Sequence, residues 1–180
     1  ISSRIVASDG KISIDFSYKK SVSELVDFLL ADDRAKAMTD TFAEEWFGLA
    51  QMPADKASML APLLSQPEYS NLTTTQLSQL VGELKQETKL FVEYVVRGKN
   101  QVKQAQQMPP VVDLLSANYS FLNSSLAEHY AETSSSTNDF AYSQLAHRKG
   151  IATHGATLMQ GGHGSEKSIV GIHINYLVFI

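Results

Sequence analysis

The clearest pattern in the chain is a run of apolar positions between residues 77 and 95. The steps between them alternate between four and three residues, which is the period of one buried helix face. Polar residues fall on the opposite side of the same run, as a solvent-facing surface requires. The pattern predicts one long amphipathic helix that starts after the threonines at 73–75 and stops at Gly98. Its buried stripe is predicted to consist of Leu77, Val81, Leu84, Thr88, Phe91 and Val95.

Shorter patterns predict two helices earlier in the chain. Ser21 and Glu24 have the spacing of a capping box, which predicts a helix over residues 25–30. A second helix is expected over residues 33–47, because apolar side chains recur there at steps of three or four residues. The core-facing stripe of this second helix is predicted to consist of Ala35, Met38, Phe42, Trp46 and Leu49.

Signals for β-structure are few. The alternation of Ile12, Ile14 and Phe16 is compatible with one short strand. Prolines break residues 53–67 into a loop with a helical turn near 59–64, and a second capping box predicts a short helix over residues 126–130. We therefore expect a mainly α fold, an irregular helical domain with one long amphipathic helix and little or no sheet.

A segment rich in serine and threonine at residues 133–138 is the best candidate for an internal boundary. The predicted helices all lie before it. Beyond it, apolar segments at 151–159 and 169–179 are separated by a pair of glycines. We expect a helical domain over residues 1–132 and a smaller, truncated module over residues 139–180 that packs on it.

Charge and composition narrow the classes of function. The 180-residue chain has a formal net charge of −4 and carries no basic stripe, so no nucleic-acid partner is expected. It contains no cysteine, which excludes disulfides, thiolate metal sites and haem attachment through C-x-x-C-H within this chain. No run approaches the roughly 20 apolar residues of a transmembrane helix. Because the chain starts on Ile1 without a methionine, we expect a piece of a longer polypeptide.

Histidine is the residue type here that is best suited to metal or haem ligation. Four of the five histidines lie near the end of the chain, at positions 147, 154, 163 and 173. Their spacings of 7, 9 and 10 residues match no tight metal signature, so no metal site is assigned and separate structural histidines are favoured. A cofactor-binding role for His154, His163 and His173 is kept as an alternative.

Other candidate sites have structural explanations. The glycines at 161–164 lack the spacing of a phosphate loop, and no serine lies in a G-x-S-x-G elbow. Trp46 could present an aromatic platform to a sugar, with Tyr69 or Tyr142, but its helical spacing favours core packing. The residues alone assign no reaction.

Several segments resemble a bacterial domain family of unknown function. Residues 115–130 fit the pattern L-x-A-x-Y-x-F-L-N-x-x-L-A-x-H-Y, and the runs at 29–35, 42–49 and 87–91 agree in order. Residues 150–170 are similar to a later pattern of the same proteins, with matches at Gly150, Gly155, His163 and Ser168. Members of this family occur in large exported proteins that also contain planctomycete-type cytochrome c domains.

The resemblance implies a context rather than a reaction. It implies a non-catalytic helical accessory or interaction module of an exported, redox-associated polypeptide, located in the periplasm or at the cell surface. Its partners would be flanking domains, among them a cytochrome c domain, and haem is expected on that separate domain, with no cofactor within this chain. The alternative is an oxidoreductase module in which His154, His163 or His173 ligates a metal or a non-covalent haem, which requires two or more of these histidines to converge.

Overall fold

The computed structural model describes residues 5–8, 11–14, 19–52, 71–133 and 138–160. The chain divides into two compact units, residues 1–38 and residues 39–180. The division falls within a helix, not in the segment at 133–138, part of which lies outside the described residues. The domains expected over 1–132 and 139–180 therefore stay a prediction.

The first unit contains a hairpin and a helix. Strands β1 (Ile5–Ser8) and β2 (Lys11–Ile14) pair antiparallel, so Ile12 and Ile14 lie in a strand as predicted. Phe16 lies outside the described residues. Helix α1 (Lys19–Ala31) begins two residues before Ser21, so the Ser21–Glu24 pair lies inside the helix and does not mark its start.

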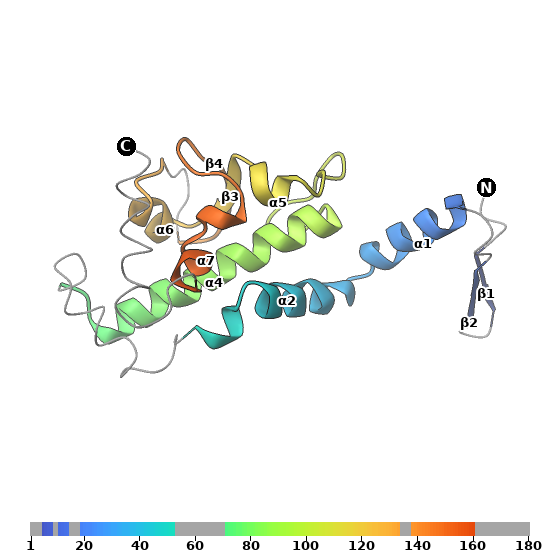
Figure 1. Ribbon diagram of the computed structural model, residues 1–180, viewed down its shortest axis with the longest axis horizontal. Coiled ribbons are helices and arrows are strands. Elements are labelled where there is room, and N and C mark those ends of the chain that lie inside the picture. The colour runs from blue at the N-terminus through green and yellow to red at the C-terminus, as the bar shows by residue number, and fades with distance from the viewer. Residues whose placement is uncertain (1–4, 9–10, 15–18, 53–70, 134–137, 161–180) are drawn as a thin grey trace. The chain divides into compact units, whose positions relative to one another are not determined.

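The second unit is organised around one long helix, α4 (Thr74–Arg97) (Figure 1). Thr73 caps it: the Thr73 side chain accepts from the Gln76 backbone, and the Gln76 side chain accepts from the Thr73 backbone. Gly98 ends it in the left-handed conformation, with φ of 68°. All six residues of the predicted stripe are buried, which confirms the long amphipathic helix.

Shorter elements pack against α4. Strands β3 (Tyr119–Leu122) and β4 (Ala141–Gln144) form an antiparallel pair, and β3 contacts α4. Helices α5 (Asp113–Ser116), α6 (Ser124–His129) and α7 (Gly155–Gln160) contact α4 as well. Two short 3-10 helices complete the described elements: η1 (Leu49–Gln51) follows α2, and η2 (Ile151–Thr153) comes just before α7. Helix dominates the described residues, so the expected fold class is confirmed.

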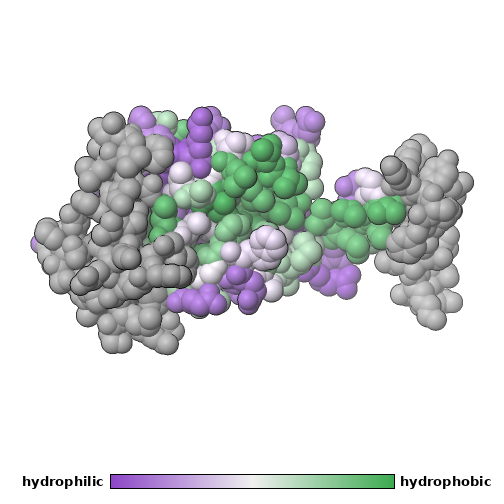
Figure 2. All heavy atoms as spheres, viewed as in Figure 1, coloured by the Kyte–Doolittle hydropathy of each residue, from purple (hydrophilic) through white to green (hydrophobic). Residues whose placement is uncertain are grey.

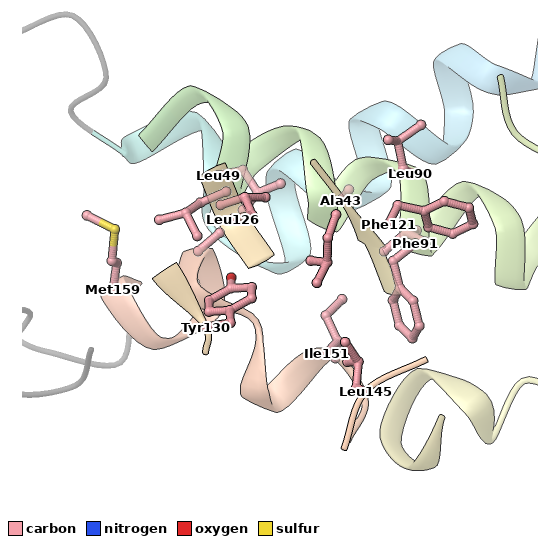
Figure 3. Close-up of a cluster of buried hydrophobic side chains, with 14 of the residues drawn as sticks. Ala43, Leu49, Leu90, Phe91, Phe121, Leu126, Tyr130, Leu145, Ile151 and Met159 are labelled. Carbon is pink, nitrogen blue, oxygen red and sulfur yellow. The ribbon is translucent and has the colours of Figure 1, made fainter. Parts of the chain in front are cut away.

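The core of the second unit is one continuous cluster of buried side chains. Figure 3 shows side chains converging there from α4, from β3 and α6, and from residues 145–159. Because so many elements surround α4, its C-terminal half is buried on nearly all sides. This enclosure goes beyond the single stripe that the sequence predicts, and it adds Leu90, Val92, Glu93, Tyr94 and Arg97 to the buried set.

The expected packing of α2 (Ala35–Trp46) is wrong in one respect. Its fully buried residues are Thr39 and Ala43, one position away from the predicted stripe. The helix is therefore rotated relative to the prediction. Trp46 is 76% exposed instead of lying in the core. Phe42 and Phe47 are partly buried and pack against the core cluster. Small residues at 39 and 43 allow close approach, which a tryptophan would prevent.

Gly150 occupies a position that only glycine tolerates. Its φ is 58° with ψ of −179°, and its N–H donates to the Ala117 carbonyl at 2.8 Å. A Cβ there would lie 2.3 Å from the Leu115 carbonyl carbon. Gly82 lies on the exposed side of α4, and a Cβ added there would have no atom within 4 Å.

We predict that Gly150→Ala lowers the free energy of unfolding by roughly 3 kcal/mol or more, because backbone strain and a backbone clash add. The matched control, Gly82→Ala, should raise it by about 0.5–1 kcal/mol, since alanine favours the helix. Urea unfolding followed by circular dichroism measures both. Equal effects of the two substitutions would contradict the described geometry at Gly150.

Candidate functional site

Of the three histidines singled out in the sequence, the structure describes one. His154 lies between η2 and α7 and is 1% exposed. His163 and His173 lie outside the described residues, so their convergence with His154 stays a prediction. His147 is exposed. Within the described residues, no group of three or more histidine, cysteine, aspartate or glutamate side chains is arranged to hold a metal ion.

Both ring nitrogens of His154 face hydroxyl groups. Nδ1 is 3.1 Å from Thr88 Oγ1, and Nε2 is 3.4 Å from Ser120 Oγ. Nε2 is also 3.8 Å from Glu87 Oε1. The face of the site away from these groups is apolar, because the Phe91 ring centroid lies 4.8 Å from that of the imidazole.

Glu87 is the hub of this group. Its Oε1 accepts from the Ser120 hydroxyl at 2.8 Å, and its Oε2 accepts from the Tyr130 hydroxyl at 2.6 Å. The Tyr130 oxygen in turn accepts from the Gly155 backbone N–H at 2.9 Å. We call Glu87, Thr88, Ser120, Tyr130 and His154 the buried polar cluster; each of its members is at most 8% exposed.

The cluster joins segments that are far apart in sequence. Glu87 and Thr88 project from the middle of α4, and Ser120 from β3. Tyr130 is the C-cap of α6, and His154 is the C-cap of η2. Gly155 can approach because it has no side chain: a Cβ would lie 2.5 Å from Leu84 Cδ2 and 2.9 Å from the Tyr130 hydroxyl.

Sequence reasoning missed most of this cluster. Thr88 was placed in the buried stripe and His154 among the candidates, but Glu87, Ser120 and Tyr130 were not singled out. The periodicity treats a glutamate beside a stripe as solvent-facing. One signal was present, since Glu87 and the stretch from Ser120 to Tyr130 fall in segments that carry the family resemblance.

Burial sets the protonation of the cluster. Burial lowers the pKa of His154, with Arg148 acting in the same direction and Glu87 opposing them. Burial, then the Glu87 charge, raise the pKa of Tyr130 well above its usual value. With its proton on Nε2, a neutral imidazole donates to Ser120, while Ser120 and Tyr130 donate to Glu87. The one Thr88 hydroxyl proton then has two acceptors, His154 Nδ1 at 3.1 Å and the Leu84 carbonyl at 3.2 Å.

A second imidazole, outside the cluster, is perturbed in the same direction. Burial lowers the pKa of His129 to about 4, with Arg148 adding to the effect and Glu87 opposing it. The Arg148 guanidinium itself lies 3.8 Å from the centroid of the Tyr130 ring. Both histidines are therefore neutral in the folded chain near neutral pH.

The cluster has the residue types of a hydrolase but not the arrangement. In a Ser–His–acid triad the histidine lies between the serine and the carboxylate. Here Ser120 donates directly to Glu87, and Ser120, Glu87 and His154 are each at most 1% exposed. A substrate could not reach the hydroxyl, and a metal would have to displace a hydrogen-bond partner of His154. The arrangement is suited to holding elements together.

The described surface is hollowed elsewhere. One pocket of about 440 Å³ lies between α4 and α6 and includes Gln76, Gln79 and His129. Another, of about 460 Å³, lies beside α5 and includes Tyr94 and Asp113. Neither is lined by His154.

The aromatic residues considered for a sugar platform do not form one in the described part of the chain. Trp46 is exposed, but Tyr142 stacks on Tyr119 and is covered by the Lys103 ammonium, 3.8 Å from its centroid. Tyr69 lies outside the described residues. No pair of solvent-facing aromatic rings is therefore available among these three positions as far as they are described.

Comparison with known proteins gives one match. The model of the PSD4 family, described as "Protein of unknown function (DUF1592)", matches residues 7–131. No curated protein and no solved structure matches. No helix of the described segments is long and apolar enough to cross a membrane.

We predict that Tyr130→Phe lowers the free energy of unfolding by about 2–4 kcal/mol, since it leaves Glu87 Oε2 and the Gly155 N–H without their partner. Tyr142→Phe is the matched control, because the Tyr142 hydroxyl only accepts from the exposed Gln144 side chain. Its cost should stay below about 1 kcal/mol. Urea denaturation separates the two, and a Tyr130→Phe variant as stable as the control would contradict the proposed hydrogen bonding.

The chain should also lose stability as the pH falls from about 7 to 5. His154 and His129 have pKa values below the unfolded value of 6.5, so the unfolded chain binds more protons in this range. Each contributes at most about 1.4 kcal/mol per pH unit to the slope. Urea midpoints measured across this range should show a shallower slope for His129→Gln and an unchanged one for His147→Gln, in which an exposed imidazole is removed. A flat profile for the unsubstituted chain would refute this account.

Proposed function

We propose that this chain, which belongs to the PSD4 family of proteins of unknown function (DUF1592), is a non-catalytic accessory module of an exported, redox-associated polypeptide. It holds or docks other domains of that polypeptide, among them a cytochrome c domain that carries the haem. The module itself contributes a rigid helical body and an interaction surface.

The observation that carries this proposal is the closure of the buried polar cluster. Glu87, Ser120 and His154 have the side-chain types of acid–base and nucleophilic chemistry, and hydrogen bonds hold them inside the core of the second unit. Groups that act on a substrate must be reachable from a pocket. Glu87, Ser120 and His154 are each at most 1% exposed and line neither of the described pockets, and their contacts support a structural role.

Exposed apolar side chains support the interaction role. Those of Val111, Val112 and Leu115 are 72%, 60% and 69% exposed around α5. Figure 2 shows hydrophobic surface in this region of the second unit. Within the first unit, α1 also exposes apolar side chains, including Phe28 at 58%. Contiguous apolar surface of this kind is typical of sites that contact another protein.

The redox association and the export come from the family resemblance of residues 115–130 and the runs that agree with it. With no cysteine, the chain has no means of holding a c-type haem covalently. The haem would therefore lie on a different domain, and this module would influence the electron-transfer protein by positioning it.

Two measurements test the proposal. Titration of the purified chain with haem, followed in the Soret region and accompanied by metal analysis, should show no saturable shift and no stoichiometric metal. The native full-length polypeptide, recovered from the periplasmic fraction of its host, should stain for covalent haem. A saturable Soret shift that is lost in His163→Ala would instead establish the oxidoreductase alternative, with His154, His163 and His173 as its candidate ligands.

A further inference from the structure

We propose that the pocket beside α5 binds a basic side chain, arginine or lysine, presented by an apolar segment of a partner polypeptide. This inference rests on the proposed function, because it names the chemistry of the partner that the module docks. The docking surface consists of the pocket and of four exposed apolar side chains around it, which we call the α5 surface: Met108, Val111, Val112 and Leu115.

The pocket has a volume of about 460 Å³. It is lined by Tyr94, Tyr119, Asp113 and the segment from Gln107 to Pro110. Among the described residues that line it, Asp113 is the one with a carboxylate. A pocket of this size accommodates one long side chain and not a whole folded element.

Two oxygen atoms of the pocket lack partners. Asp113 Oδ2 accepts from the Tyr119 hydroxyl at 2.8 Å, but no described residue donates to Oδ1. The Tyr94 hydroxyl forms no hydrogen bond within the described part of the chain, and Tyr94 lines the pocket. The buried, unpartnered polar atoms of the described residues belong to other side chains, so both pocket oxygens are open to the pocket, where a bound group can reach them. Both oxygens can accept an N–H bond, which a guanidinium or ammonium group supplies.

Charge favours a cation over a neutral donor. No described cation forms an ion pair with Asp113: the nearby Lys103 ammonium lies over the Tyr142 ring, 3.8 Å from its centroid. Burial, with the Asp113 charge in addition, raises the pKa of Tyr94, so its phenol stays protonated beside the carboxylate. The chain carries a net charge of −4, which also favours association with a basic partner.

The apolar rim favours a polypeptide over a small cation. The residues of the α5 surface are between 47% and 72% exposed. Met108 also lines the pocket, and Val111 and Val112 lie in the chain between the pocket residues Pro110 and Asp113. A small amine would leave these side chains in water. A segment with apolar residues on both sides of its basic residue would cover them, in the usual arrangement of an anchor within an apolar contact.

The test uses a fluorescently labelled peptide with one arginine between leucines, and a second peptide in which neutral citrulline replaces the arginine. Anisotropy titration of the full chain should show saturable binding of the arginine peptide, and binding of the citrulline peptide at least about tenfold weaker. Asp113→Asn should remove this preference. Glu45→Gln, which neutralises an exposed carboxylate on α2, should leave it unchanged.

Further variants separate a lost contact from a lost fold. Tyr119→Phe frees the second oxygen of Asp113, so it should bind the arginine peptide at least as tightly as the unsubstituted chain. Tyr94→Phe should weaken binding, and Val112→Ser should weaken both peptides by the same factor. Urea midpoints of all variants report their folding.

Equal affinity for the two peptides, or a preference that survives Asp113→Asn, would overturn the inference. Absence of any binding would do so as well. If the chain stays free of haem while neither peptide binds, only this inference fails. If haem binds saturably, the proposed function fails, whatever the peptides do.

Discussion

A carboxylate inside an apolar core has to be hydrogen-bonded, and in this protein that requirement falls on Glu87. Leaving a charged group buried without partners costs several kcal/mol, so the residues around it have little positional freedom. Ser120 and Tyr130 must bring their hydroxyls to the two oxygens of the carboxylate. In consequence β3 and the end of α6 are both held against the middle of α4. Tyr130 extends the constraint to the start of α7, because its oxygen accepts from Gly155.

The same constraint explains why residue types that occur in catalytic sites are arranged differently here. Hydrogen bonds that hold four segments together use the donors and acceptors that a substrate or a metal would need. His154 illustrates this, since both of its ring nitrogens face hydroxyls and the Phe91 ring covers it. Buried polar groups of this kind favour one arrangement of a core over its alternatives, because any other packing would leave a polar group unpaired. We infer that the cluster contributes to the uniqueness of the second unit's fold.

The proposed function depends on the surface and not on the core. Around α5 the described surface combines exposed valines and a leucine with a pocket that contains one unpaired carboxylate oxygen. In the proposed recognition each part has a different role: the apolar side chains would supply contact area, and the pocket would supply selectivity for a cation. A module of a larger redox polypeptide could position its neighbours with such a surface. Membership of a family of unknown function is compatible with this role and assigns no reaction.

The sequence by itself determined the parts of the fold that depend on local periodicity. The stripe from Leu77 to Val95 and the stop at Gly98 were readable, because a helix buries every third or fourth residue and ends where glycine allows a left-handed turn. The start was predicted only as following the threonines at 73–75, and the cap at Thr73 was not predicted. Only the tertiary structure decided which side of α2 is buried. Thr39 and Ala43 face the core and Trp46 does not, because the fit against neighbouring elements selects the smaller side chains. It also decided the partners of Glu87, which lie 33 and 43 residues away along the chain. Contacts over such separations depend on how the elements pack, and no pattern within one segment records them.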